Sequence, residues 1–237
     1  MNQKKNKHSS VVLFSGGIDS TTALVWAKQT FGHAIALTVH YAQRHRIEVE
    51  MARTIARNLG IDYHLIDFPL KDIIYSALID RDQAIPESLA ASKNEEGVPI
   101  TYVPFRNGIF LSLAAAFAES RGIRHLVTGF NRIDTPDYPD TTVRFTQKMQ
   151  AAINAGTSAA ITGKKFHIHA PLIEMSKKEI IAWGLELGAD YSYSVSCYRG
   201  SEMPCLKCPS CDIRNSAFHQ LNMEDPLITR LKKEGKQ

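Results

Sequence analysis

Short, β-branched apolar runs alternate with longer amphipathic stretches along the first part of the chain. The runs at 11–14, 33–40 and 62–67 are typical of buried strands, since a parallel sheet is covered on both faces. The stretches 20–31 and 47–59 repeat apolar residues at helical spacing. Because parallel neighbours need helical crossovers, this order predicts an α/β fold with a doubly wound parallel sheet.

The alternation is interrupted once and then resumes. Prolines and a polar run predict an insertion over 69–104 that leaves the sheet, and we expect it to be mobile. The later elements are predicted as a helix over 106–122, a strand over 124–129, a loop over 130–141, a strand over 165–171 and a helix that a Ser176–Glu179 capping box opens and Gly188 ends. In this division residues 1–10 form a basic tail, 11–190 the α/β domain and 191–237 a C-terminal subregion.

Composition and charge are those of an ordinary globular protein with one large core. Of the 237 residues, 44% are hydrophobic and 22% are charged. The net charge of +4 lies partly in lysines near both ends, so it is weak support for a nucleic-acid partner and we expect none. No apolar run approaches the ~20 residues of a membrane-spanning helix, and the N-terminus lacks a signal-peptide core. We therefore expect a cytoplasmic protein with no membrane partner.

All four cysteines fall in one short window near the C-terminus. They are Cys197, Cys205, Cys208 and Cys211. A disulfide framework usually spreads its cysteines along the chain, so this clustering predicts a metal site in a reducing compartment. Four thiolates saturate a tetrahedral zinc ion, which favours one structural zinc ion per chain, with an iron–sulfur cluster as the alternative. His167 and His169 share one face of a predicted strand, but the cysteines make a second metal site there the less favoured interpretation.

The segment FSGGIDSTT (14–22) lies where the first predicted strand ends and a helix begins. Its glycines let the backbone approach a ligand, and its hydroxyl and N–H groups at a helix N-terminus suit a phosphate. The segment resembles the SGGxDS signature of the N-type ATP pyrophosphatases, which implies ATP as the ligand. A carboxylate at Asp19 would repel a triphosphate unless a divalent cation lay between them, which predicts Mg²⁺. The alternative is that Asp19 only interacts with the helix dipole.

Six segments of the chain follow one another in an order known from one enzyme family. They are SGGIDSTT (15–22), VHYAQRHRIEVE (39–50), TYVPFRNGIF (101–110), TGFNRIDTPDYPD (128–140), APLIEMSKKEI (170–180) and SCYRGSEMPCLKCPSCDIR (196–214). In this order they resemble the QueC family of 7-cyano-7-deazaguanine synthases, over about residues 11–218. The resemblance implies an adenine nucleotide alpha hydrolase-like, Rossmann-like ATP-pyrophosphatase domain followed by a zinc-binding knuckle. It also implies a homodimer that uses ATP, zinc and ammonia to convert a deazaguanine carboxylic acid to its nitrile in queuosine biosynthesis.

The candidate site residues follow from these motifs together with the resemblance. The catalytic candidates are Asp19, Ser20, Arg44 and Arg106. A guanidinium fork suits phosphate or carboxylate oxygens, although either arginine could also be a solvated surface residue. The ATP-binding candidates are Phe14, Ser15, Gly16, Gly17, Ile18, Asp19, Ser20, Thr21, Thr22, Ala23, Leu24, Arg106 and Gly129. The substrate-binding candidates are Asn107, Asp134, Asp137, Tyr138 and Asp140, of which the carboxylates can accept from a guanine-like ring, with turn formation as the alternative role.

The favoured function is an ATP-dependent carbon–nitrogen ligase that forms an acyl-adenylate and then an amide on the way to the nitrile. The chain differs from the usual pattern of the family at several positions, among them Phe105 in place of a glycine, Arg132 in place of an acidic residue and Thr142 in place of an arginine. They leave open a QueC-like paralogue that stops at the amide or transfers the acid to another amine, which a small molecule or a protein could supply. A tRNA-thiolating enzyme of the same superfamily and an inactive nucleotide-binding module are further alternatives.

Overall fold

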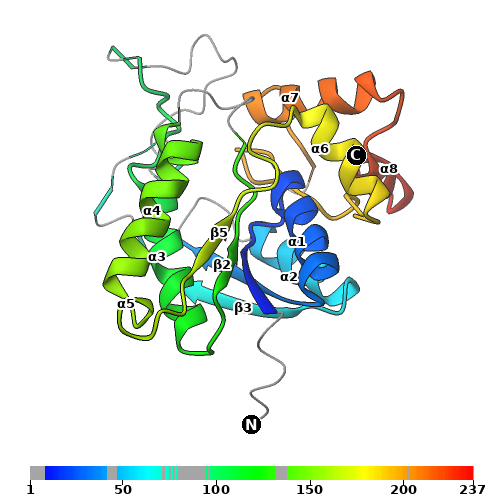
Figure 1. Cartoon of the computed structure of the whole chain (residues 1–237). Helices are drawn as coiled ribbons and strands as arrows, with labels where there is room; N and C mark the ends of the chain where they lie inside the picture. Colours follow the sequence, from blue (N-terminus) through cyan, green and yellow to red (C-terminus); the bar gives the residue numbers. More distant parts are fainter. Residues whose placement is uncertain are drawn as a thin grey trace.

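A five-stranded, wholly parallel sheet forms the centre of the molecule, with the strand order β3-β2-β1-β4-β5 (Figure 1). The strands are β1 (Ser9–Leu13), β2 (His33–His40), β3 (Asp62–Asp67), β4 (His125–Val127) and β5 (His167–His169). The computed structural model describes residues 9–41, 47–70, 73–74, 76, 78–79, 94–95, 97–131, 138–201 and 203–236. The order confirms the predicted doubly wound α/β fold.

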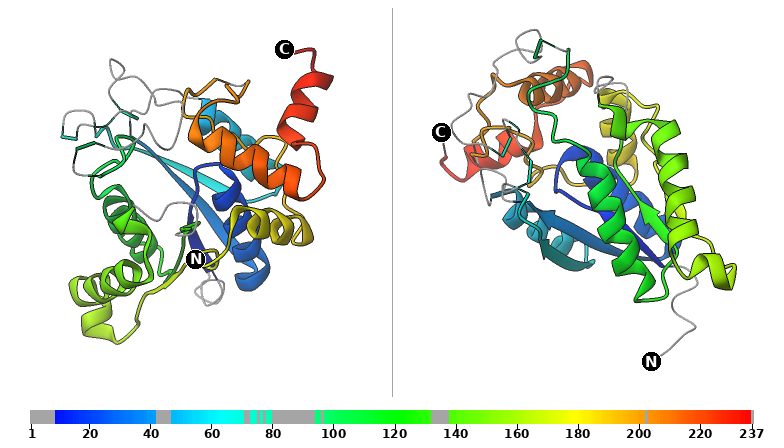
Figure 2. Two further views of the ribbon diagram at one scale, coloured as in Figure 1. Left: turned by 90° about the horizontal axis from the view of Figure 1, so that it is seen from above. Right: turned by 90° about the vertical axis from the view of Figure 1, so that its left-hand side faces the viewer.

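Helices cover both faces of this sheet (Figures 1 and 2). One face carries α1 (Ile18–Phe31), α2 (Ile47–Asn58) and α6 (Lys177–Glu186), and the other carries α3 (Arg106–Glu119), α4 (Val143–Gly156) and the short α5 (Ala159–Thr162). The remaining helices are the 3₁₀ turn η3 (Pro139–Thr141), α7 (Pro209–Gln220), which packs on α6, and α8 (Pro226–Lys233).

Alternate strand residues enter two separate apolar layers. Val12 and Ala36 pack toward α1 and α2, whereas Val11 and Leu37 pack toward α3. Because both faces are buried, the strands are continuous apolar runs in sequence rather than alternating ones. From β1 the chain proceeds outward to β2 and β3, then returns to β4 on the other side of β1. Such a reversal opens a crevice at the C-terminal ends of the strands, where ligands bind in open α/β sheets.

Most predicted elements are present with boundaries shifted by a few residues. Strand β1 begins at Ser9, so residues 9–10 belong to the sheet and not to the predicted tail. Helix α4 was not predicted, although Phe145, Met149 and Ile153 follow one another at i+4 spacing. Most of the predicted 69–104 insertion lies outside the described residues, and the division of the chain near 190 stays a prediction.

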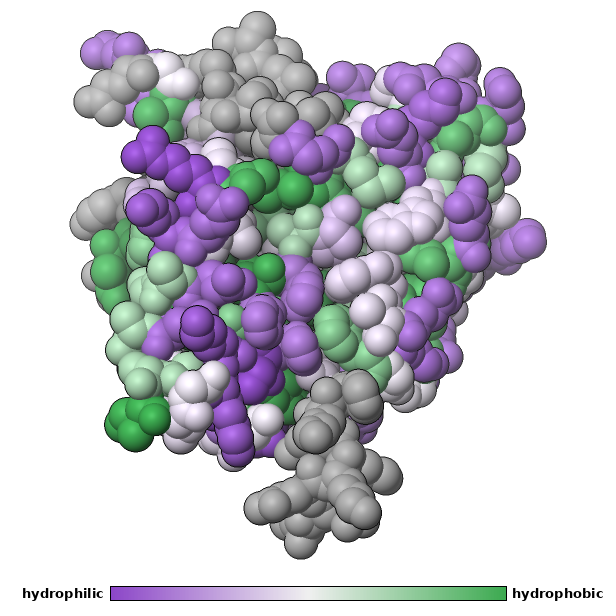
Figure 3. Space-filling model, viewed as in Figure 1, coloured by the Kyte–Doolittle hydropathy of each residue, from purple (hydrophilic) through white to green (hydrophobic). Residues whose placement is uncertain are grey.

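Within the described part of the chain, no helix has both the length and the apolar character to cross a bilayer. On the face of the molecule seen in Figure 3, hydrophobic areas are small and are interrupted by hydrophilic residues. The apolar residues are therefore concentrated in the two layers that flank the sheet.

Three histidines meet on neighbouring strands β4 and β5. The Nδ1 atom of His125 lies 3.1 Å from Nε2 of His169, and the rings of His125 and His167 stack with centroids 5.6 Å apart. Among the described residues, the four cysteines are the one group of three or more ligand side chains close enough to share an ion, so the three histidines do not form a second such group. Burial, followed by the charges of His125 and His167, lowers the pKa of His169 to about 4.

This lowered pKa predicts a loss of stability in mild acid. In the unfolded chain this histidine binds a proton below its ordinary pKa of about 6.5, whereas in the folded protein His169 binds one only below its pKa of about 4. Protonation therefore favours the unfolded chain between these two pH values, and the free energy of unfolding falls as the pH is lowered across that window. Because the ring is only half-buried, we expect about 1–2 kcal/mol from this residue. Urea unfolding of the wild type and of His169→Gln at pH 7.5, 5.5 and 4.5 measures the difference, and parallel pH profiles for the two proteins would contradict it.

Candidate active site

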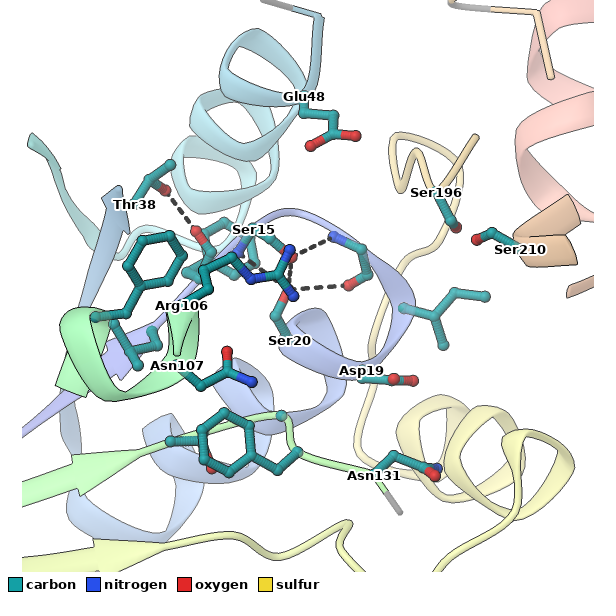
Figure 4. Close-up of a pocket in the computed structure, with 18 of the residues that line it drawn as sticks. Ser15, Asp19, Ser20, Thr38, Glu48, Arg106, Asn107, Asn131, Ser196 and Ser210 are labelled. Atoms are coloured by element: carbon teal, nitrogen blue, oxygen red, sulfur yellow. Dashed lines mark hydrogen bonds between the residues drawn. The ribbon is translucent and has the colours of Figure 1, made fainter. Parts of the chain in front are cut away.

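A pocket of about 390 Å³ opens at the C-terminal edge of the sheet. Its walls come from the loop after β1, the ends of β2 and β4, the first turns of α2, α3 and α6, and the segment that joins α6 to α7. Figure 4 shows side chains from these separate elements around the space, with Glu48 entering from α2 and Arg106 from α3. The volume lies within the range of small-molecule sites.

The loop after β1 is held in shape by its own hydroxyl groups. Ser20 Oγ accepts the backbone N–H of Ser15 at 3.2 Å and donates to the carbonyl of Gly17 at 3.1 Å. Gly16 has φ of +80°, and a Cβ there would lie 3.1 Å from backbone atoms of Ala52 in α2. Glycine is therefore the residue that suits this position, because any side chain would be strained by the positive φ and crowded by α2. The loop directs the N-terminus of α1 into the pocket, where the helix dipole favours an anion.

Two neighbouring strands fix this loop from outside. Thr38 of β2 donates its hydroxyl to the carbonyl of Phe14 at 2.6 Å. After β4, a Cβ on Gly129 would lie 2.9 Å from the carbonyl carbon of Asp19 and from the backbone nitrogen of Ser20. Gly129 therefore packs against the loop through its backbone, and its assignment to the ATP site stays a prediction.

The predicted ATP-binding residues divide into two groups. The pocket is lined by Phe14, Ser15, Gly17, Ile18, Asp19, Ser20, Arg106 and Gly129. The next four residues, Thr21, Thr22, Ala23 and Leu24, are fully buried and face the core. Thr22, for example, donates to the carbonyl of Ile18 and pairs with the hydroxyl of Tyr191 at 2.7 Å. The side chains of these four residues therefore face the core, and their assignment to the nucleotide site, which includes their backbone N–H groups, stays a prediction.

The predicted substrate residues are also separated by the structure. Asn107 and Tyr138 line the pocket. Asp140 does not, because its carboxylate accepts the backbone N–H of Asn107 at 3.0 Å and its carbonyl accepts the Asn107 side chain at 3.3 Å. Asp140 therefore holds the first turn of α3. The residue at the N-cap of this helix, Phe105, makes no side-chain capping hydrogen bond of its own. The candidates Arg44, Asp134 and Asp137 lie outside the described residues.

Two of the positions that differ from the family pattern have local structural roles. Phe105 adopts a left-handed conformation with φ of 53°, which a glycine would adopt without strain, and its ring covers Gly108. Thr142 caps α4 by accepting the backbone N–H of Phe145 at 3.1 Å. The third position, Arg132, lies outside the described residues.

Arg106 brings an unneutralised positive charge to the pocket. Its Nη1 donates to the hydroxyl of Tyr41 at 3.1 Å, and its guanidinium lies 5.7 Å from the centre of the Tyr41 ring. Among the described residues no carboxylate forms an ion pair with it. Burial raises the pKa of Tyr41 and of nearby Tyr198, so both phenols stay neutral donors. This corner of the pocket suits a carboxylate or a phosphate.

Lys177 is a site residue that the sequence analysis missed. Its Nζ lies 2.5 and 2.7 Å from the two carboxylate oxygens of Asp19, and both residues line the pocket. The confirmed Ser176–Glu179 capping box fixes the helix turn that carries it. The capping pattern identified the helix, but nothing local in the sequence shows that residue 177 meets residue 19.

Arg214 is a second missed residue. It is 3% exposed, and its guanidinium pairs with Asp225 at 2.5 and 2.8 Å. It also donates to the carbonyl of Ser194 at 2.6 Å. Arg214 therefore ties α7 and the start of α8 to the segment that carries Ser196 and Tyr198 into the pocket wall.

The four cysteines form a compact cluster beside this wall. Their Sγ atoms all lie within 4.8 Å of one another, with Cys205 and Cys211 4.0 Å apart. Metal–sulfur bonds of about 2.3 Å in a tetrahedron place sulfur atoms roughly 3.8 Å apart, so the donor set fits one tetrahedral ion. A cluster of several iron atoms would hold the sulfurs further apart.

The family model and the relatives found by sequence agree on one family. The family model described as "Queuosine biosynthesis protein QueC" matches residues 9–222. The 7-cyano-7-deazaguanine synthase of Cupriavidus pinatubonensis is 41% identical over 220 residues, which cover 92% of this chain and 96% of that protein. The protein of the same name from Pseudomonas aeruginosa is 40% identical over 229 residues, which cover 95% of this chain and 98% of that protein. Among solved structures, NMN synthetase from Francisella tularensis is 14% identical, covers 96% of this chain and 77% of its own, and has a TM-score of 0.49.

The close approach at Gly129 predicts the effect of a single methyl group. Gly129→Ala should push the β4 loop away from Asp19 and Ser20, weaken ATP binding at least about tenfold and lower the free energy of unfolding by ~1–3 kcal/mol. Gly156→Ala is the control, because a Cβ there meets nothing within 4 Å. Calorimetric titration with ATP and urea unfolding measure both effects, and equal affinities in the two variants would contradict the prediction.

The cysteine geometry predicts a structural metal. Cys208→Ser should reduce bound metal well below one ion per chain and lower Tm by about 6 °C or more, because metal binding contributes to folding. Lys207→Gln changes an exposed neighbour and should leave both unchanged. Elemental analysis and differential scanning calorimetry provide the measurement. Metal loss without a change in Tm would argue against a structural role.

Proposed function

The chain belongs to the QueC family of queuosine biosynthesis proteins, and from this premise we propose that it is a 7-cyano-7-deazaguanine synthase, an ATP-dependent ligase. The observation that carries the proposal is the position of the SGGIDS loop. This loop directs the N-terminus of α1 into the same pocket that holds the unneutralised guanidinium of Arg106. A phosphate site and a second anion site thus share one cavity, as adenylation of an acid requires.

The proposed reaction uses ATP twice on 7-carboxy-7-deazaguanine. A carboxylate is a poor electrophile, so its oxygen first attacks the α-phosphorus of ATP and pyrophosphate leaves. Ammonia then displaces AMP to give the amide. A second adenylation, now on the amide oxygen, releases pyrophosphate, and loss of AMP and of both amide protons leaves the nitrile. The enzyme contributes mainly position and charge, because binding must favour the transition state over the bound acid.

The residues that line the pocket have distinct parts in the proposed reaction. Ser15, Ser20 and the N-terminus of α1 bind the phosphates, since hydroxyl and N–H donors converge there. Arg106 neutralises the carboxylate or a phosphate oxygen. Asn107 and Tyr138 line the remaining part of the pocket, and we assign them to the deazaguanine.

Two metals were predicted, and the described residues fit one of them. The four cysteines fit zinc, which would hold Tyr198 and Ser210 in the pocket wall and, with all four positions filled, would supply no open site for catalysis. Magnesium at Asp19 fits less well, because both carboxylate oxygens contact the Lys177 ammonium. We therefore assign no step of the reaction to a magnesium ion at Asp19.

The remaining expectations are part of the proposal. They are ammonia as the amine, a homodimer and a cytoplasmic location. The amide-forming paralogue is the nearest alternative. A sulfur-carrying or cluster role for the cysteines, as a tRNA-thiolating enzyme would need, has less support because the thiols fit a single ion.

Mass spectrometry tests the proposal directly. Purified protein incubated with 7-carboxy-7-deazaguanine, ATP, magnesium and ammonium should yield the nitrile and AMP. Arg106→Lys should raise KM for the acid about tenfold or more, because an ammonium cannot replace a guanidinium fork. Arg121→Lys, an exposed arginine near the end of α3, is the control. Accumulation of the amide alone would favour the paralogue, and no acid-dependent release of pyrophosphate would exclude both.

A further inference from the structure

The Asp19 carboxylate is already occupied by a positive charge. Lys177 Nζ contacts both of its oxygens, at 2.5 and 2.7 Å. The Asp19 side chain is 26% exposed and the Lys177 side chain 16%, so the pair is partly shielded from water. An ion pair of this depth and bidentate geometry is stronger than an exposed one.

The two partners are fixed independently of each other. Asp19 belongs to the first turn of α1, which the loop after β1 and Gly129 hold in place. Lys177 is the first residue of α6, directly after the capping residue Ser176. The pair therefore joins two helix N-termini at the pocket, where each helix dipole would otherwise favour an anion.

A divalent cation cannot share the carboxylate with this ammonium without strong repulsion. Within the described residues, no group of three or more acidic, histidine or cysteine ligands other than the four cysteines could hold a cation. The phosphates of ATP would change this balance, because they offer oxygen ligands to a cation and a new partner to the lysine.

We propose that Lys177 closes the Asp19 carboxylate to divalent cations in the nucleotide-free protein and transfers its ammonium to the phosphates when ATP binds. The second half of the proposal rests on the proposed use of ATP, whereas the first half does not.

Titration with Mn²⁺ followed by electron paramagnetic resonance, without nucleotide, tests the first half. Lys177→Met should bind Mn²⁺ about tenfold or more tightly than the wild type, and adding Asp19→Asn should remove that gain. Lys177→Arg keeps the charge and should bind as weakly as the wild type. Lys178→Met, at the exposed neighbouring position, is the matched control.

Equal Mn²⁺ affinity in the wild type and Lys177→Met would overturn the proposal. If Lys177→Met does not fold, the wild type and Asp19→Asn decide: equally weak binding supports the proposal, and a wild-type site that Asp19→Asn removes overturns it.

Calorimetry with Mn²⁺ and ATP tests the transfer. Lys177→Met should bind the nucleotide about tenfold or more weakly, while Lys178→Met should match the wild type. Unchanged affinity would overturn the transfer. A wild type that does not bind ATP would contradict the proposed function, while the nucleotide-free comparison would still decide the role of Lys177.

Discussion

The absence of side chains at two glycines lets the backbones of three elements meet, and the pocket depends on that contact. Gly16 brings the loop after β1 against α2, and Gly129 brings the loop after β4 against the same segment. A Cβ atom would lie 3.1 Å from backbone atoms of α2 at Gly16 and 2.9 Å from backbone atoms of the α1 N-terminus at Gly129. Because backbone cannot move aside as a flexible side chain can, these contacts fix the N-terminus of α1 relative to the reversal point of the sheet.

The charges of the pocket follow from this placement. The N-terminus of α1 and Arg106 provide two sites for anions, whereas Asp19 provides the opposite charge and is neutralised by Lys177. A pocket that combines the N-terminus of α1 with a guanidinium, and whose Asp19 carboxylate is paired with a lysine, is suited to a polyanion such as ATP together with an acidic substrate. Specificity for a deazaguanine must come from polar groups that match the ring edge, since charge alone does not distinguish one acid from another.

The C-terminal subregion serves the pocket as much as it stabilises the fold. Tyr198 directly follows one cysteine and Ser210 lies between two others, and both line the cavity. Arg214 binds Asp225 and the carbonyl of Ser194, which joins the same wall to the start of α8. A buried ion pair of this kind contributes little net stability but strongly restricts the geometry, because losing either partner would leave a buried charge.

Local patterns in the sequence determined the order of the strands and of most helices, the anion-binding loop and the cysteine cluster. These features depend on residues that are neighbours along the chain: apolar periodicity, glycines beside hydroxyls, a capping box and closely spaced thiols. The tertiary structure alone decided that Lys177 neutralises Asp19, that Asp140 holds Asn107 instead of lining the pocket, and that Thr21 to Leu24 face the core. Those outcomes depend on how elements far apart in the chain cross and rotate, and the propensity of a single segment carries no information about its partner.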